Sequence, residues 1–312
     1  MTMGPRRARI SALAKINLDL KVLGKRPDGF HELRTVYQTI SLADTIEVEF
    51  VPSPRTAIRL EAAVEIPDNL VLRAARMVMD ATGAAGRLSF RLTKRIPAGA
   101  GLGGGSSDAA AVLLALPVLV GKRIRPDTLI RLAAEIGSDV PFFLLGGTAV
   151  GVGRGSELYP LPDVFSARGL VVVPSVRVST AEAYGALGRQ LTTEVPANII
   201  DSFQSRAWLT GLVSGENDFE RAVFGRYPRL KSLKKKLLKL GADPAMMTGS
   251  GSALFGIFRN PEGLEKALSS FHEEKVFRIA TVSRARYRSL WWRRLGVHID
   301  ARIWPPQSRY EP

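Results

Sequence analysis

One glycine-rich segment constrains the fold of this chain more than any other part of it. The sequence PAGAGLGGGSSDAAA, residues 97–111, follows an expected strand from Leu88 to Thr93 and opens an apolar helix. Glycines let the backbone approach an oxyanion closely, and a helix N-terminus offers unpaired N–H groups with a partial positive charge. Because each glycine adds entropy to the unfolded chain, packing alone is a weak reason for so many. The segment therefore predicts a loop that binds phosphate groups.

Two well-known phosphate loops do not explain this segment. Gly99, Gly101 and Gly104 have the spacing GxGxxG, but a dinucleotide fold also needs a βαβ unit with an acidic residue about 20 residues on. Here the next expected element is a second helix, Pro126 to Ile136. The Walker string GxxxxGK[ST] does not occur in the chain. A glycine-rich turn without a ligand is the structural alternative.

The remaining sequence patterns predict an α+β protein. Alternating or β-rich residues predict strands before the phosphate loop, and a turn is expected at Arg26-Pro27-Asp28-Gly29. A helix is expected from Asn69 to Thr82, with Asn69 or Asp68 as its N-cap. The expected strands are Ile10–Leu23, Ile40–Phe50, Ala57–Leu60, Leu88–Thr93, Leu170–Val173 and Ala253–Phe258, and the long apolar helix is expected over Ser106–Leu116. We expect a first lobe over residues 1–165, a second over 166–289 and a basic aromatic tail over 290–312.

Composition removes several classes of chemistry. The chain has no cysteine and only three histidines, so disulfides and thiolate sites are excluded and imidazole metal sites are disfavoured. Catalysis must use carboxylates, lysine, hydroxyls and backbone amides. The longest apolar stretch, Ala109 to Val120, is interrupted by Pro117 and is shorter than the roughly 20 residues that cross a bilayer. We expect a cytoplasmic enzyme without a membrane span, either a monomer or a homodimer.

The charge of the chain admits more than one kind of partner. The formal net charge is +15 and the pI is near 10.4, which would attract nucleic acid or an anionic membrane. The excess is concentrated in residues 231–239 and from Arg284 onward. We interpret these as a solvated helix face and an appended tail, and we expect no specific nucleic-acid partner. A phosphate-rich substrate would also be attracted by such a field.

Phosphoryl transfer to an alcohol needs a base and a cation, and the sequence offers one candidate for each. Asp139 follows the helix-ending Gly137 and leads into the apolar run VPFF, where it is placed to act as a base. Lys15 lies inside the apolar strand SALAKINLDL, where an ammonium is costly without a partner such as a buried carboxylate. The structural alternatives are a turn-capping aspartate and a surface lysine on an edge strand.

The phosphate loop carries a resemblance to a known family. PAGAGLGGGSSDAA resembles the signature loop of the GHMP kinases, such as galactokinase, homoserine kinase and mevalonate kinase, which wrap it around the phosphates of ATP. The GLGGGSS form and the neighbouring motifs resemble the branch that acts on diphosphocytidyl-methylerythritol, a cytidine diphosphate sugar alcohol of the non-mevalonate isoprenoid pathway. The resemblance runs from about Ala12 to about Tyr287. It implies a two-lobed α+β fold, with a ribosomal-protein-like N-terminal lobe and a ferredoxin-like C-terminal lobe.

The resemblance implies the roles of several residues. Lys15 of AKINL and Asp139 of GSDVP match a pair that faces the 2-hydroxyl to be phosphorylated. MgATP would lie along the loop, with Asn69 and Lys94 near the adenine and with metal ligands that the sequence does not identify. The loop residues concerned are Pro97, Ala98, Gly99, Ala100, Gly101, Leu102, Gly103, Gly104, Gly105, Ser106 and Ser107.

The same resemblance implies a site for the acceptor substrate. The turn KRPDGFHEL suggests that Phe30 stacks on the cytosine and that His31 pairs with its edge, with Asn17 nearby. Thr180 and Tyr184 match positions on the other side of the base and at the substrate phosphates. Gly249 and Ser250 belong to MTGSGSALFGIF, which resembles a third glycine motif that packs on the phosphate loop. The rival hypotheses are another GHMP kinase, acting on homoserine or a mevalonate derivative, and a nucleic-acid-binding protein built on a kinase fold.

The end of the chain departs from the family pattern. After about Ser289 the sequence reads LWWRRLGVHIDARIWPPQSRYEP, with adjacent tryptophans among arginines. Such a segment suggests an interaction tail or a contact with a membrane surface. The simpler expectation is an unstructured extension, and we adopt it.

Overall fold

Two β-sheets organise the residues that the computed structural model describes, which are 4–63, 68–163, 166–188 and 215–310. The first has six strands in the order β3-β4-β2-β5-β6, with β1 paired to β2; only β3 and β4 run parallel. The second has four antiparallel strands in the order β10-β7-β9-β8. The strands are β1 (Arg6–Lys25), β2 (His31–Pro52), β3 (Ala57–Ala62), β4 (Gly86–Thr93), β5 (Thr148–Gly153), β6 (Glu157–Pro160), β7 (Arg168–Val173), β8 (Ala245–Met247), β9 (Leu254–Phe258) and β10 (Lys275–Ala280).

The three helices expected from the sequence are present as α1, α2 and α3, with differences at their ends. They are α1 (Leu70–Thr82), α2 (Gly104–Val120), α3 (Pro126–Ile136), α4 (Val140–Leu145), α5 (Thr180–Gly188), α7 (Phe219–Arg226), α8 (Pro228–Lys239), α9 (Pro261–Leu268) and α10 (Arg284–Leu295), followed by the 3-10 turn η1 (Gly296–His298). Asn69 is the N-cap of α1, since its side chain accepts a hydrogen bond from Val71 N. The helix α2 continues through Pro117, beyond the expected end at Leu116. Every residue of α2 from Ser107 to Val120 is buried, so packing outweighs the missing hydrogen bond.

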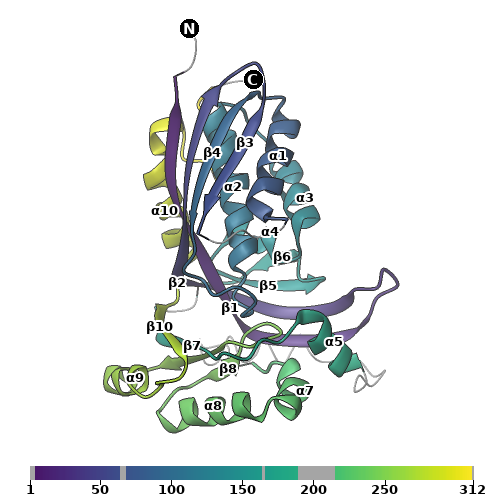
Figure 1. The fold of residues 1–312 in the computed structure, drawn as a ribbon, viewed down its shortest axis with the longest axis vertical. Helices are drawn as coiled ribbons and strands as arrows, with labels where there is room; N and C mark the ends of the chain where they lie inside the picture. Colours follow the sequence, from purple (N-terminus) through teal and green to yellow (C-terminus); the bar gives the residue numbers. More distant parts are fainter. Residues whose placement is uncertain (1–3, 64–67, 164–165, 189–214, 311–312) are drawn as a thin grey trace.

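The first two strands form a long antiparallel ribbon that joins the two sheets. β1 pairs with β2 from Arg6 opposite Phe50 to Lys25 opposite His31, which is longer than the expected strand Ile10–Leu23. Figure 1 shows both strands continuing from the upper sheet, beside β4, to the level of α5. Apolar side chains of the ribbon form one buried cluster with Val171 of β7 and Phe255 of β9. The ribbon therefore places its central residues where the two lobes meet.

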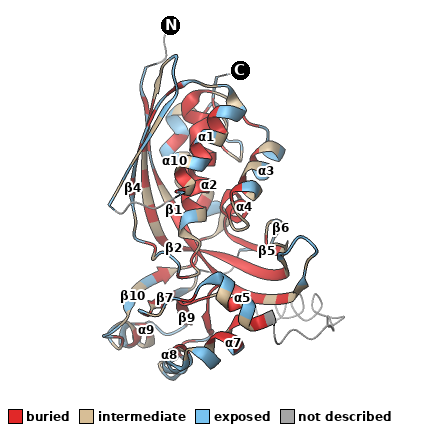
Figure 2. Cartoon of the chain, turned by 45° about the vertical axis from the view of Figure 1, so that its right-hand side comes forward, coloured by how far each residue is buried: buried red, intermediate tan, exposed pale blue. Residues whose placement is uncertain are grey.

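The largest core lies between the first sheet and the helices α1 to α4. In Figure 2 buried residues cover most of α2, which the sheet and α1 enclose. A second core joins the four-stranded sheet to α5, α7, α8 and α9. The expected lobe boundary at residue 165 lies outside the described residues. None of the helices in the described part of the chain is both long and apolar enough to span a membrane.

The expectation of an unstructured extension at the C-terminus is wrong. Residues Arg284–Leu295 form α10, which returns from the second sheet and packs against β1 of the first (Figure 1). Trp291 and Leu295 are buried in the first core, and Trp304 Nε1 donates a hydrogen bond to Leu144 O at 3.1 Å. The two tryptophans looked like surface residues because arginines surround them, but a helix turns Trp291 inward while its charged neighbours stay outside.

Candidate active site

Two cavities meet along the phosphate loop. One, of about 820 Å³, lies where the ribbon, the loop and the second lobe converge. The other, of about 390 Å³, lies between the loop and the start of α1. Gly99, Gly101, Gly103 and Ser106 line both cavities. A molecule in the smaller cavity and a molecule in the larger one would therefore face each other across this loop.

The strand β1 is irregular where it reaches the loop. Its register against β2 shifts between Leu13 and Lys15 and again between Asn17 and Asp19. Such bulges redirect side chains and leave backbone groups free for other partners. The N–H of Lys15 uses this freedom to donate to Leu102 O of the phosphate loop at 3.0 Å. The strand and the loop are thus held at a fixed distance.

Lys15 and Asp139 lie together in the larger cavity. Lys15 Nζ is 3.5 Å from Asp139 Oδ2, and the lysine is only 3% exposed. Asp139 begins α4 without a capping hydrogen bond from its side chain, so its carboxylate is turned to the cavity. Tyr37 donates its hydroxyl to Asp139 Oδ1 at 3.0 Å. Burial first, and then the Asp139 charge, raise the pKa of Tyr37 well above its usual value, so the tyrosine stays a donor.

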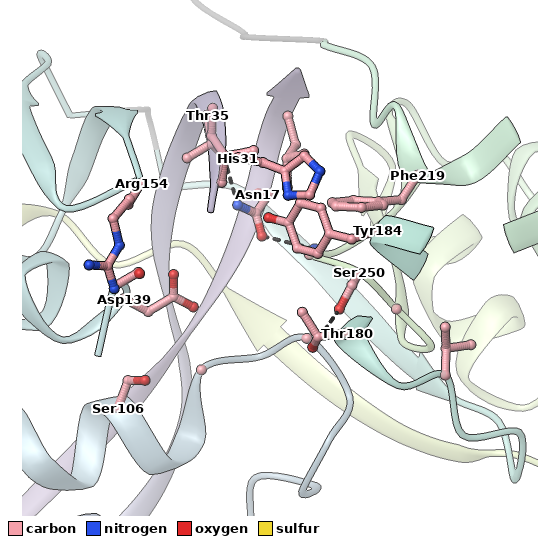
Figure 3. A pocket seen from close by; sticks show the side chains of 18 of the residues that line it. Asn17, His31, Thr35, Ser106, Asp139, Arg154, Thr180, Tyr184, Phe219 and Ser250 are labelled. Carbon is pink, nitrogen blue, oxygen red and sulfur yellow. Dashed lines mark hydrogen bonds between the residues drawn. The ribbon is translucent and has the colours of Figure 1, made fainter. Parts of the chain in front are cut away.

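Asn17 fixes the position of the Lys15 ammonium through hydrogen bonds. Its Oδ1 accepts hydrogen bonds from Lys15 Nζ at 2.7 Å and from Gly249 N at 2.9 Å. Its Nδ2 donates to Thr35 Oγ1 at 2.7 Å, as drawn in Figure 3. Thr248 adds a further bond to the same Asn17 oxygen. The amide is therefore occupied by the protein itself, and its evident effect is to orient Lys15.

The glycine-rich turn of residues 248–251 packs directly on the phosphate loop. Gly101 has a φ of +78°, and a Cβ at this position would overlap the carbonyl oxygen of Thr248. Thr248 Oγ1 lies 3.2 Å from Gly101 O and shares its one proton between this oxygen and Asn17 Oδ1. Ala253 N donates to Ala100 O at 3.3 Å. The close approach of two backbones explains why glycine is required at residue 101.

The far end of the larger cavity is aromatic. His31 stacks on Tyr184, with ring centroids 4.4 Å apart, and Phe219 packs edge-on against the other side of Tyr184. Burial lowers the pKa of His31, which favours the neutral imidazole with one donor and one acceptor nitrogen. Phe30 is 47% exposed at the rim. Thr180 and Ser250 share a hydrogen bond of 3.2 Å between their hydroxyls (Figure 3). This end offers flat apolar faces beside neutral polar groups.

Two buried carboxylates flank a lysine behind the phosphate loop. Lys94 Nζ donates to Asp108 Oδ2 at 2.7 Å and also to Asp44 Oδ2. Asp44 additionally accepts from the backbone N–H groups of Arg95 and Ile96. Burial raises the pKa of Asp108 to about 7, and the Asp44 charge adds to this rise while Lys94 opposes it. The cluster therefore fixes Lys94 at the wall of the smaller cavity and leaves Asp108 able to hold a proton near neutral pH.

Substitution of Asp108 by asparagine should make stability less dependent on pH. The pKa of the carboxyl rises from 3.8 in the unfolded chain to about 7 in the folded protein, so its stabilising effect is lost as the pH rises between these values. We expect Asp108→Asn to match the wild type near pH 4 and to have the higher Tm at pH 8. A change of ~1 kcal/mol shifts Tm by about 2–4 °C in proteins somewhat smaller than this one.

The control for this prediction is Asp80→Asn, which changes an exposed carboxylate on α1. Differential scanning fluorimetry across pH 4–8 would give the Tm gap between each variant and the wild type. A gap for Asp108→Asn that stays constant over this range would contradict a carboxyl that titrates near pH 7.

The structure brings almost all of the predicted site residues to these two cavities. The larger is lined by both predicted catalytic residues and by Asn17, Phe30, His31, Thr180, Tyr184, Gly249 and Ser250, and the smaller by Asn69, Lys94 and residues 97–106. Ser107 lines neither, because it is 1% exposed and donates its hydroxyl to Leu13 O. Tyr37 and Arg154 also line the larger cavity and were not predicted. Neither stands in a distinctive motif, so only the fold reveals them: Tyr37 lies on β2, and Arg154 lies in the turn between β5 and β6.

The residues at the loop fit a magnesium ion that arrives with a nucleotide. Mg²⁺ usually takes one or two protein oxygens together with phosphate oxygens and water. Ser106 faces both cavities, and Asp139 faces one of them. No group of three or more acidic or histidine side chains suited to a metal occurs among the residues that the structure describes. An ion here would therefore depend on phosphate oxygens for most of its ligands.

Comparisons with known proteins point to a single family. A family model described as "GHMP kinases N terminal domain" matches residues 69–147, and one described as "GHMP kinases C terminal" matches residues 207–276. A curated protein of Solibacter usitatus (strain Ellin6076), named 4-diphosphocytidyl-2-C-methyl-D-erythritol kinase, is 58% identical over 98% of this chain and 99% of its own length. The similarity therefore includes the C-terminal segment beyond residue 289.

Two solved structures complete the comparison. The crystal structure of a 4-(cytidine 5'-diphospho)-2C-methyl-D-erythritol kinase has a TM-score of 0.75 and 35% identity, covering 88% of this chain and 98% of that one. A homoserine kinase from Cytophaga hutchinsonii has a TM-score of 0.69 but only 19% identity, covering 89% of this chain and 95% of that one. The second likeness shows a shared fold alone.

Proposed function

The chain belongs to the 4-diphosphocytidyl-2-C-methyl-D-erythritol kinases, a branch of the GHMP kinase family, and from this membership we propose how its residues carry out the reaction. The enzyme transfers the γ-phosphoryl group of ATP to the 2-hydroxyl of 4-diphosphocytidyl-2-C-methyl-D-erythritol. The observation that carries the proposal is the Lys15–Asp139 pair, which lies in the larger cavity beside a glycine loop shared with the smaller one.

Asp139 serves as the base in this proposal. The hydroxyl oxygen attacks the γ-phosphorus, its proton passes to the Asp139 carboxylate, and the bond between the γ-phosphorus and the bridging oxygen of ADP breaks. Lys15 Nζ is a fixed cation next to the carboxylate, where it stabilises negative charge on the attacking oxygen and on the transferring group. Tyr37 orients the carboxylate through its hydrogen bond, and Asn17 orients the ammonium.

The two cavities divide the substrates between them. ATP fits the smaller one, where the N-terminus of α2 and the glycine backbone offer N–H groups to its phosphates and Asn69 and Lys94 border the place for the adenine. Magnesium, when bound with ATP, would neutralise phosphate charge, and Ser106, which lines both cavities, would offer it a hydroxyl oxygen. The cytidine half of the acceptor lies at the aromatic end, against Phe30, His31 and Tyr184. A cytoplasmic location and a monomeric or homodimeric state stay predictions.

The choice of acceptor tests this proposal most directly. We expect ATP consumption in a coupled assay with Mg²⁺ only when the cytidylyl acceptor is present, because homoserine and mevalonate 5-phosphate have no base for the aromatic end. Turnover with either of these acceptors at a comparable kcat/KM would contradict the proposed substrate while leaving the kinase assignment intact. Absence of turnover with all three acceptors would contradict both.

A further inference from the structure

Arg154 occupies a defined position in the larger cavity although no motif identifies it. It lies at the tip of the hairpin between β5 and β6, immediately after Gly153. The next residue, Gly155, has a φ of +87°, and a side chain there would contact the hydroxyl of Tyr37. The hairpin can therefore press closely on Tyr37, which carries Arg154 to the cavity wall. Figure 3 shows Arg154 entering the pocket from the side on which Asp139 lies, across from Tyr184.

The guanidinium of Arg154 stacks on an aromatic ring and forms no ion pair with the described residues. Its Cζ lies 3.6 Å from the centroid of Phe30, a stacked cation–π contact. Its Nε is buried and has no hydrogen-bond partner within the described part of the chain. No carboxylate of the described residues lies within ion-pair distance of it, and Asp28 in the adjacent turn is paired with Arg26 at 3.2 Å. A buried donor without an acceptor is costly, and no acceptor among the described residues offsets that cost here.

The other basic groups of the cavity are already committed. The charge of Lys15 is balanced by Asp139, and its ammonium is also bound to Asn17. His31 is favoured in its neutral form by burial. Among the described residues that line the cavity, Arg154 is therefore a cation without an ion-pair partner, although it is close enough to Asp28 to help lower the pKa of that carboxyl.

The negative charge of the acceptor lies on its diphosphate. Its diphosphate joins the cytidine, which the proposed function places against Phe30, His31 and Tyr184, to the sugar alcohol that reacts at Asp139. The diphosphate must therefore cross the stretch of wall between Phe30 and Asp139. Arg154 touches Phe30 and enters from the side of Asp139. An arginine is suited to two phosphate oxygens at once, because its planar fork presents paired N–H donors.

We propose that Arg154 binds the diphosphate of the acceptor substrate and so fixes the distance between the base and the reacting hydroxyl. This inference rests on the proposed function. Thr180 and Ser250, which are also near this end, supply neutral hydroxyls, and Arg154 supplies the charge.

Two ligands that share the base and differ in the diphosphate test the inference. We would measure binding of CDP and of cytidine by calorimetry to the wild type and to Arg154→Met, which keeps an apolar contact with Phe30 but loses the charge. Arg154→Lys keeps the positive charge but loses the paired N–H donors of the guanidinium. Arg59→Met on the exposed face of β3 is the control for an equal change in net charge. Unchanged Tm and unchanged ADP affinity would show that each variant is folded.

We expect Arg154→Met to weaken CDP binding about ten- to a hundredfold and to leave cytidine binding within about threefold, because charge-assisted hydrogen bonds are lost only with the diphosphate. The CDP affinity of Arg154→Lys should lie between that of the wild type and that of Arg154→Met. Arg59→Met should bind CDP as the wild type does. In turnover, the KM for the acceptor should rise and the KM for ATP should stay unchanged.

Three results would overturn the inference, and they differ. If the wild type prefers CDP to cytidine and Arg154→Met keeps that preference, Arg154 does not bind the diphosphate and the proposed function stands. If the wild type binds neither ligand while it still binds ADP, the proposed acceptor is wrong and this inference falls with it. An equal loss of CDP and cytidine binding would assign Arg154 to the ordering of Phe30 alone.

Discussion

Replacement of Asp139 by asparagine should lower kcat by about 10²–10⁴-fold, the usual range for loss of a general base. The amide keeps the size of the side chain and can still accept the hydrogen bond from Tyr37, but it cannot take the hydroxyl proton. The carboxylate makes no capping bond to α4, so the helix does not depend on it. We therefore expect an unchanged affinity for ADP, measured by calorimetry. Tm, measured by fluorimetry, should fall only a little, because Lys15 loses its counter-charge but keeps its hydrogen bond to Asn17.

The matched control is Asp127→Asn, which alters an exposed carboxylate in the first turn of α3. That variant should keep the kcat of the wild type. Undiminished turnover by Asp139→Asn would exclude this residue as the base. A loss of ADP binding together with a large fall in Tm would instead reveal a structural part for the carboxylate, in agreement with the turn-capping alternative.

Truncation of Trp291 to alanine should lower the free energy of unfolding by about 3–5 kcal/mol, as other large aromatic truncations in cores do. Trp291 is only 2% exposed, and its ring packs edge-on against Tyr287 and Trp304 with centroids 6.1 and 6.4 Å away. Alanine would leave a cavity under α10 that these two rings cannot fill. Urea unfolding followed by far-UV circular dichroism would measure the loss.

Val297→Ala is the control from the same segment, because this valine is 73% exposed. We expect it to change stability by no more than about 0.5 kcal/mol. If Trp291→Ala were equally mild, α10 would not be part of the first core, and the expectation of a dispensable extension would regain its force.

Local chemistry made much of the site predictable. The phosphate loop could be identified because its glycines and the following helix leave few other uses for such a sequence. Lys15 alone was compatible with a surface position, and the resemblance to the GHMP kinases was needed to pair it with Asp139. The structure gives a physical reason for the pairing, since bulges in β1 turn Lys15 toward the loop while α4 presents Asp139.

Other parts of the site depend on contacts between distant segments. Tyr37 lies in a continuously buried part of β2, and its role appears only when β2 brings it beside Asp139. Arg154 is one of many arginines, and it is distinguished by the hairpin that carries it to Phe30. The prediction of an unstructured C-terminal tail failed because a local feature of its sequence was misinterpreted. Its dense charge suggested exposure, although the core of the first lobe takes up one face of its helix.

The position of α10 also orders events during synthesis of the chain. The first lobe is built from the N-terminal strands and helices, yet Tyr287, Trp291 and Leu295 complete its core. A ribosome adds roughly 5–20 residues per second, so these side chains emerge only after the whole second lobe has been made. Until then the surface of the first lobe that α10 will cover stays open to water. The second sheet can close beforehand, and the N-terminal half reaches its final packing only after α10 has been made.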